Sequence, residues 1–224
     1  MRKLVLGVMV SGGGTNLQSI LDACRAGRID AEVAVVISNK SGAYGLERAR
    51  RAGVAAVCVP AGPRSGSREW AAADLEHLQI LREHEVGLVC MAGYMRRLGP
   101  QVYAAYAGRV MNIHPALLPS FSGAHGRRDA VEYGVRVSGC TVHFADAQFD
   151  TGPIIIQAAV PVLPGDDEAS LGERILAQEH KLYPQAIQWF AQGRLRLEGR
   201  QVVLDNPPPP TICEAIISPG LEIL

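Results

Sequence analysis

Three residues in two short segments, Asn112, His114 and Asp150, have side chains that together could carry out acyl transfer. Asn112 and His114 follow an apolar run and lie two positions apart, so in a strand both side chains point to the same face. An amide can donate a hydrogen bond to a developing oxyanion, and an imidazole can move a proton near neutral pH. Asp150, in the turn Asp150-Thr151-Gly152-Pro153, offers a carboxylate that could orient the imidazole. A histidine after a strand is equally often an ordinary loop residue, so this pattern alone leaves both interpretations open.

A second candidate site lies near the N-terminus, where the apolar run from Leu4 to Val10 leads into Ser11-Gly12-Gly13-Gly14-Thr15-Asn16-Leu17. A strand, a glycine loop and a helix N-terminus together favour phosphate, because backbone N–H groups and the helix dipole face the anion. The segment is neither a Walker loop, since no lysine precedes Thr15, nor a complete dinucleotide fingerprint. From the residues alone, it is either an anion site or a turn that permits tight packing of strand and helix.

The elements that must position these residues alternate along the chain. Hydrophobic patterns and turn residues predict strands at 4–10, 33–37, 54–59, 86–91, 109–113, 138–145 and 154–160, and helices at 16–26, 44–52, 67–84, 100–106, 128–133 and 168–192. Residues 195–197 and 202–204 are expected to form a small hairpin, and Pro184 is expected to kink or interrupt the last helix. This alternation predicts an α/β fold, with a layered, largely parallel sheet, helices on both faces and a Rossmann-like N-terminal half. Both candidate sites follow strands, and such sheets bind ligands at the strands' carboxyl ends, so one shared cleft is expected.

The composition excludes several classes of partner. Lys and Arg number 22, as do Asp and Glu, so no bulk charge indicates a nucleic-acid partner, and 48% apolar residues suit a buried core. The five cysteines have no metal-like or redox-like spacing, which favours reduced thiols. The short apolar run after Met1 lacks a signal-peptide cleavage site, and no stretch reaches membrane-spanning length. We therefore expect a soluble cytoplasmic protein without a membrane partner or a metal.

The segments Asn112-Ile113-His114-Pro115, Leu117-Leu118-Pro119 and Asp150-Thr151-Gly152-Pro153 resemble motifs of the folate-dependent formyltransferases. The N-terminal glycine loop is similar to that of the members that formylate glycinamide ribonucleotide. The resemblance runs from about residue 3 to about residue 204. It implies the formyltransferase fold and transfer of a formyl group from 10-formyltetrahydrofolate to the amine of glycinamide ribonucleotide, in de novo purine biosynthesis.

The resemblance also implies a domain layout. Residues 1–204 would form a single formyltransferase domain, with a phosphate-binding half at about 1–108 and a catalytic and folate-binding half at about 109–204. Residues 205–224 would be a proline-rich break followed by a tail. Whether the protein is a monomer or a homodimer stays open.

Two sets of binding residues follow from the same resemblance. The ribonucleotide and its phosphate would contact Gly12, Gly13, Gly14, Thr15, Asn16, Leu17 and Glu179. The folate would contact Arg68, Met95, Arg96, Arg97, Leu98, Asn112, Asp146, Ala147, Gln148, Phe149 and Asp150. An arginine at a helix start, such as Arg68, and a glutamate in mid-helix, such as Glu179, are also common solvent-exposed residues.

The chain departs from the family pattern at three positions of the folate and catalytic half. Relatives often have an aliphatic residue at Arg97, a proline at Ser122 and a histidine at Arg127. These departures leave one wall of the folate pocket and any role of His125 open.

In the implied reaction, His114 is the acid and base, Asn112 is the oxyanion donor, and Asp150 orients His114 and favours its charged form. His143 is expected to be a strand-packing residue. Two relatives are alternatives. A formyltetrahydrofolate deformylase would share the catalytic loop but is expected to carry an additional N-terminal domain. A methionyl-tRNA formyltransferase is expected to carry a C-terminal tRNA-binding domain. A ligand-binding protein without activity is a further alternative. A dehydrogenase is disfavoured, because Ser38-Asn39-Lys40 stands where an acidic residue would bind the ribose.

Overall fold

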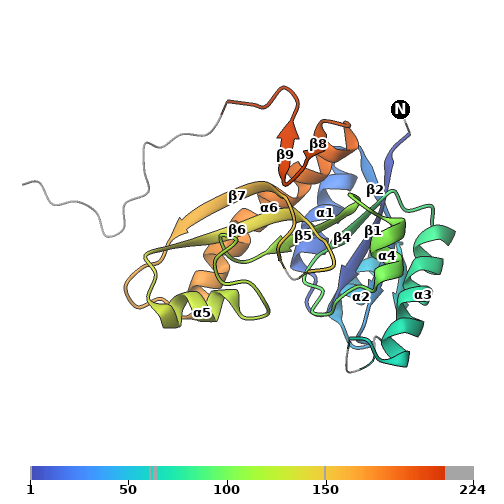
Figure 1. The fold of residues 1–224 in the computed structure, drawn as a ribbon, viewed down its shortest axis with the longest axis horizontal. Coiled ribbons are helices and arrows are strands. Elements are labelled where there is room, and N and C mark those ends of the chain that lie inside the picture. The colour runs from blue at the N-terminus through green and yellow to red at the C-terminus, as the bar shows by residue number, and fades with distance from the viewer. Residues whose placement is uncertain (1, 61, 63–64, 149, 210–224) are drawn as a thin grey trace, which may run out of the picture.

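A seven-stranded sheet in the order β3-β2-β1-β4-β5-β6-β7 runs through the centre of the computed structural model, which describes residues 2–60, 62, 65–148 and 150–209 (Figure 1). The first five strands are parallel, whereas β6 is antiparallel to β5 and β7 is antiparallel to β6. The strands are β1 (Leu4–Val10), β2 (Ala31–Ser38), β3 (Ala55–Cys58), β4 (Leu88–Met91), β5 (Val110–His114), β6 (Val137–Phe144) and β7 (Ile154–Pro161). The strand order reverses between β1 and β4, which is where open α/β sheets form a ligand crevice.

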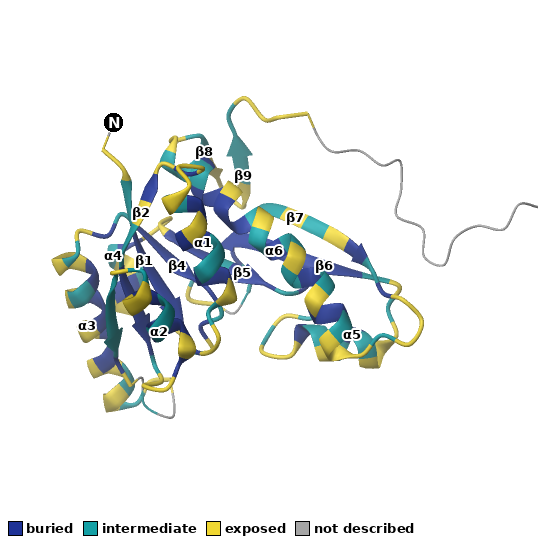
Figure 2. Cartoon of the chain, turned by 180° about the vertical axis from the view of Figure 1, so that it is seen from behind, coloured by how far each residue is buried: buried dark blue, intermediate teal, exposed yellow. Residues whose placement is uncertain are grey.

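Helices cover both faces of this sheet, and a two-stranded hairpin follows the last helix. The helices are α1 (Thr15–Arg25), α2 (Tyr44–Arg51), α3 (Arg68–Glu83), α4 (Pro100–Ala105), α5 (Gly126–Tyr133) and α6 (Glu168–Ala191), and the hairpin strands are β8 (Leu195–Glu198) and β9 (Gln201–Leu204). The helices turn exposed residues outward and buried residues toward the sheet (Figure 2). The fold class and the type of every element expected from the sequence are confirmed, and α5 begins at Gly126, two residues earlier than expected.

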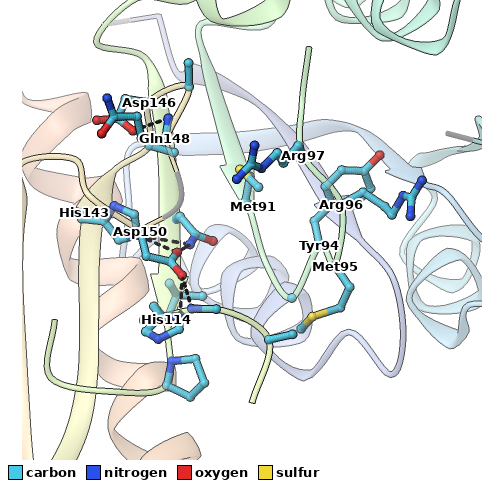
Figure 3. A pocket seen from close by; sticks show the side chains of 18 of the residues that line it. Met91, Tyr94, Met95, Arg96, Arg97, His114, His143, Asp146, Gln148 and Asp150 are labelled. Carbon is cyan, nitrogen blue, oxygen red and sulfur yellow. Dashed lines mark hydrogen bonds and ion pairs between the residues drawn. The ribbon is translucent and has the colours of Figure 1, made fainter. Parts of the chain in front are cut away.

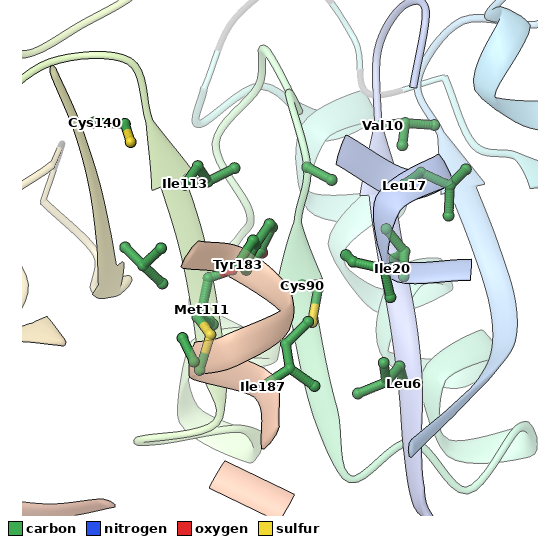
Figure 4. Packing of buried hydrophobic residues seen from close by; sticks show 14 of the residues in the cluster. Leu6, Val10, Leu17, Ile20, Cys90, Met111, Ile113, Cys140, Tyr183 and Ile187 are labelled. Atoms are coloured by element: carbon green, nitrogen blue, oxygen red, sulfur yellow. The ribbon is translucent and has the colours of Figure 1, made fainter. Parts of the chain in front are cut away.

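The core is divided by the sheet into two hydrophobic clusters. One joins the sheet to α1, α2, α5 and α6 and includes the fully buried side chains of Leu6, Leu17 and Ile20 (Figure 4). The other joins the opposite face to α3 and α4 through residues such as Leu81 and Val102. Burying a large aliphatic side chain of this kind contributes about 1.5–3 kcal/mol relative to leaving it exposed.

The last helix, α6, continues through Pro184 rather than ending there. Residues on both sides of this proline, including Ile175 and Ile187, are buried in the core, so their packing offsets the hydrogen bond that proline removes. The hydroxyl of the fully buried Tyr183 lies 2.8 Å from the carbonyl oxygen of Met111 and 3.1 Å from that of Met91. This phenol thus ties α6 to the carboxyl end of β4 and to the beginning of β5.

Among the described residues, none of the helices is long and apolar enough to cross a membrane. Cys24, Cys58, Cys90 and Cys140 are free thiols, the last two buried. Cys213 and residues 210–224 of the predicted tail lie outside the described residues.

Candidate active site

Asn112 and His114 lie two positions apart on β5, and Asp150 reaches them from the loop between β6 and β7 (Figure 3). Oδ2 of Asp150 is 3.5 Å from Nδ1 of His114, and its Oδ1 is 3.4 Å from Nδ2 of Asn112. The side chains of His114 and Asp150 are only 5% and 7% exposed, so water screens their interaction weakly. The structure therefore brings together the three side chains that the sequence singled out.

The backbone around Asp150 is shaped to hold its carboxylate in this position. Asp150 has φ +51°, in the left-handed region that aspartate tolerates better than most residues, and its Oδ2 accepts a hydrogen bond of 2.8 Å from the N–H of Gly123. Two residues later, a Cβ at Gly152 would lie 1.7 Å from the carbonyl oxygen of Phe144. Only glycine fits there, so the turn motif is dictated by the close approach of the loop to β6.

The other side of the His114 ring is also fixed. Nε2 lies 2.8 Å from the carbonyl oxygen of Phe121. A carbonyl oxygen only accepts hydrogen bonds, so Nε2 carries a proton in this arrangement. When Nδ1 also takes up a proton, the ring forms an ion pair with Asp150, whose Oδ2 lies 3.5 Å away.

His143 belongs to the same cluster, which the expectation of strand packing missed. It pairs with Asn112 across β5 and β6, and its Nε2 lies 3.1 Å from Nδ2 of Asn112. Its Nδ1 is 3.1 Å from the carbonyl oxygen of Phe144, so the proton sits on Nδ1, and Nε2 accepts a hydrogen bond from the Asn112 amide. Burial lowers the pKa of His143, which favours the neutral ring that this arrangement needs. His143 therefore orients the amide of Asn112.

Beside this cluster is a cavity with about 780 Å³ of empty space, part of which opens to solvent. Its walls come from the loop after β4, the end of β5, and the loop after β6. The sequence-predicted residues that line it are Met95, Arg96, Arg97, Asn112, His114, Asp146, Ala147, Gln148 and Asp150. The sequence did not single out Tyr94 and Tyr103, which also line it.

Two of the expected folate residues that the structure describes, Leu98 and Arg68, are not part of this lining. Leu98 is 2% exposed and lies in the core beneath the loop. Arg68 is exposed at the start of α3, where its neighbour Trp70 donates a hydrogen bond of 3.1 Å to the carbonyl oxygen of Arg97. Phe149 lies outside the described residues.

The glycine loop ends β1 and starts α1 as the sequence predicted. Gly14 has φ +69° and caps the helix, and the first helical hydrogen bond runs from the N–H of Gln18 to its carbonyl oxygen. The N–H groups of Thr15, Asn16 and Leu17 therefore stand at the helix N-terminus, ahead of that first bond. The Leu17 side chain is fully buried in the core, so this residue offers only its backbone to a ligand.

Glu179, from the middle of α6, meets the start of α1. Nδ2 of Asn16 donates a hydrogen bond of 2.7 Å to Oε2 of Glu179, and both residues are buried. Burial raises the pKa of Glu179, and the nearby Asn16, Arg127 and His114 act in the opposite direction. Oδ1 of Asn16 is buried without a hydrogen-bond partner among the described residues. The glycine loop is therefore joined to a polar pair that lies within electrostatic reach of the catalytic cluster.

Within the described part of the chain, no group of three or more His, Cys, Asp or Glu side chains is arranged to hold a metal ion. The side chains of the cluster can themselves supply proton transfer and electrostatic stabilisation.

The chain is similar in sequence and in structure to known proteins. The family model of the formyl transferases matches residues 3–187. Phosphoribosylglycinamide formyltransferase of Escherichia coli (strain K12) is 45% identical over 89% of this chain and 92% of its own length. The crystal structure of glycinamide ribonucleotide transformylase 1 from Symbiobacterium toebii has a TM-score of 0.86 and 52% identity, covering 91% of this chain and 94% of that chain.

A formyltetrahydrofolate deformylase from Pseudomonas syringae pv. tomato is a more distant match. Its structure has a TM-score of 0.83 but 27% identity, covering 90% of this chain and 66% of the deformylase chain. The family match over most of the chain, together with the buried cluster of Asn112, His114 and Asp150, confirms the resemblance seen in the motifs: this chain belongs to the formyl transferase family.

Proposed function

We propose that this chain transfers a formyl group from 10-formyltetrahydrofolate to the amine of glycinamide ribonucleotide, a step of de novo purine biosynthesis. One observation carries the proposal: the Asn112, His114 and Asp150 cluster lines a cavity at the same sheet edge as a glycine loop that starts a helix. The names of the Escherichia coli and Symbiobacterium toebii relatives support this pair of substrates.

The acceptor would bind at the N-terminus of α1. Its phosphate would take hydrogen bonds from the N–H groups of the segment Gly12 to Leu17, where the helix dipole also favours an anion. The unpartnered Oδ1 of Asn16 and the carboxyl group of Glu179 would bind polar hydrogens of the ribose or of the glycinamide. A buried polar atom without a partner costs about 1–3 kcal/mol, so a ligand that donates to Asn16 is favoured.

The donor would bind in the cavity beside His114. The lining of this cavity combines apolar groups, such as Met91 and Ala145, with a few polar ones, such as Arg96 and Asp146, and small-molecule pockets typically have this mixture. The pterin would lie between the loop Met95 to Arg97 and the loop Asp146 to Gln148. Leu98 would support the rim from below, and Arg68 would bind the glutamate tail outside the cavity.

The reaction would be a direct displacement at the formyl carbon. The acceptor amine forms a bond to this carbon, giving a tetrahedral intermediate, and the bond from the carbon to the folate nitrogen then breaks. The amine loses one proton and the folate nitrogen gains one, and His114 carries this proton between them. Asn112 donates to the oxyanion in exchange for its long hydrogen bond of 3.4 Å to Asp150, and Asp150 stabilises charged His114.

A second candidate function is hydrolysis of the formyl folate, which the deformylase match brings into consideration. Water would then be the acceptor, and the glycine loop would have no ligand to bind. The loop geometry and the higher identity to the ribonucleotide-formylating relatives favour the transferase.

The experiment uses absorbance to measure the release of tetrahydrofolate from 10-formyltetrahydrofolate, once in the presence and once in the absence of glycinamide ribonucleotide. Turnover that requires the ribonucleotide is expected. Equal turnover without it would make the protein a hydrolase and would remove the ligand assigned to the glycine loop. A chelator should leave the rate unchanged, because no step in the proposal uses a metal.

A further inference from the structure

Ser11, the residue between β1 and the glycine loop, contacts two other loops of the sheet edge. It is 4% exposed, and its Oγ lies 2.5 Å from Oδ1 of Asn39, after β2, and 2.8 Å from the backbone nitrogen of Met95, after β4. Its own N–H donates a hydrogen bond of 3.0 Å to the carbonyl oxygen of Gly93. Three hydrogen bonds of one small residue therefore cross-link the loops that follow β1, β2 and β4.

The direction of each hydrogen bond follows from its partners. A serine hydroxyl has one proton, and Oδ1 of Asn39 can only accept, so the proton points to Asn39. The lone pairs of Oγ are then free to accept from the N–H of Met95. Asn39 thus fixes the hydroxyl in the orientation that holds Met95.

The loops that Ser11 joins belong to different pockets. Gly12, its direct neighbour, begins the loop assigned to the ribonucleotide, whereas Gly93 and Met95 line the cavity assigned to the folate. Met95 is 60% exposed, so burial of its side chain contributes little to holding this rim. Ser11 anchors the rim to the ribonucleotide loop itself, whereas the contact of Trp70 with Arg97 anchors it to α3.

We propose that Ser11 is a positioning residue that couples the two substrate pockets. A ribonucleotide that orders the glycine loop also orders Ser11, and through it the rim that receives the folate. Such a coupling is reciprocal, so folate binding strengthens ribonucleotide binding by the same factor. The inference rests on the proposed function, because it assigns one substrate to each pocket.

The test measures the dissociation constant of tetrahydrofolate by titration calorimetry, with and without saturating glycinamide ribonucleotide. Tetrahydrofolate carries no formyl group, so the complex with both ligands does not react. For the unmodified protein we expect binding to tighten at least about fivefold when the ribonucleotide is present, the lower end of typical coupling. In Ser11→Ala the ratio should fall below about twofold, with a larger effect on KM for both substrates than on kcat.

Ser38→Ala is the matched control. Ser38 is also buried at the carboxyl end of a strand, and its hydroxyl bonds to the backbone of Lys40, at 3.0 Å and 3.1 Å. This variant should keep the ratio of the unmodified protein. Ser11→Cys retains most of the side-chain volume but bonds weakly, so it replaces Ser11→Ala if the alanine variant does not fold.

The outcomes separate the two proposals. A ratio near one in the unmodified protein, an undiminished ratio in the Ser11 variants, or an equal loss in Ser38→Ala would each overturn the coupling role. If the unmodified protein does not bind glycinamide ribonucleotide at all, the proposed function itself is wrong. Binding of both ligands without coupling would leave the proposed function standing.

Discussion

Replacing Asp150 with asparagine should slow the chemical step by about 10²–10³-fold. The substitution keeps the side-chain shape but removes the negative charge that lies 3.5 Å from Nδ1 of His114. Two opposite unit charges about 4 Å apart interact by about 4 kcal/mol at the effective dielectric constant of about 20 that suits protein sites. Because about 1.4 kcal/mol corresponds to a factor of ten in rate, complete loss would cost about 10³. The dipole of the new amide recovers part of this lost interaction energy, which sets the lower end of the expected range of rate reductions.

Hydrogen bonding adds to the loss of charge. Asp150 accepts hydrogen bonds from Gly123 at 2.8 Å and from Asn112 at 3.4 Å. An asparagine has one acceptor oxygen, so it can satisfy one of these donors and must turn its own N–H groups toward the other. We therefore expect Asp150→Asn to disturb Asn112 as well as His114.

The assay is a single-turnover measurement of formyl transfer with the enzyme in excess and both substrates saturating, which isolates the chemical step. Asp146→Asn is the comparison, because Asp146 lines the same cavity but bonds to Gln148 and Thr151 instead of His114. Its substitution should raise KM for the folate more than it slows the chemical step. A single-turnover rate within tenfold of the unmodified protein for Asp150→Asn would refute the role of Asp150 in stabilising charged His114.

Three further predictions concern other parts of the molecule. Asn112→Ala should lower kcat by roughly a hundredfold or more, because an oxyanion donor contributes about 3 kcal/mol; unchanged steady-state turnover would contradict the oxyanion role. Glu179→Gln should raise KM for glycinamide ribonucleotide at least about tenfold with little change in KM for the folate, and equal effects on both substrates would argue against its assignment to the acceptor. Burial lowers the pKa of His77 from 6.5 to about 4, so between these values the unfolded chain binds more protons than the folded one. The stability that comes from keeping His77 neutral is present above about pH 6.5, and the free energy of unfolding should fall by about 3 kcal/mol as the pH drops to about 4. Urea unfolding at stepped pH values measures this slope, which should be shallower in His77→Gln.

Most of the fold could be predicted because local patterns of apolar and turn residues indicate its strands and helices. The apolar run Leu4–Val10 followed by glycines allows only a buried strand and a tight turn, and the helical spacing of Leu17 and Ile20 leaves one apolar face for the sheet. The continuation of α6 through Pro184 could not be predicted in this way. It depends on core contacts made by residues on both sides of the proline, and local helix propensity carries no information about such contacts.

Sequence motifs were enough to find candidate site residues that lie within a motif. They could not show which side chains from distant parts of the sequence contact one another. Asn112, His114 and Asp150 were found from motif order, and the structure brings them into one cluster. The contact of Asn112 with His143 depends on the register of β5 against β6, which brings together two residues that are 31 positions apart in the sequence. Similarly, the match at Leu98 located a loop correctly but could not show that this side chain turns into the core.

The hydroxyl of Tyr183 is held between the carbonyl groups of Met91 and Met111, so it fixes α6 against the two strands next to the site. Glu179 lies one helical turn before Tyr183, so the carboxyl group that we assign to the acceptor and the contact with the beginning of β5 belong to the same helix. Exposing Glu179 or Tyr183 to solvent means breaking the core, which in a cooperative domain approaches the cost of global unfolding. The rim around Met95 faces solvent and can separate from the sheet locally. We therefore expect the proposed folate ligand to enter and leave past the rim, while α6 and the strands keep the catalytic side chains in place.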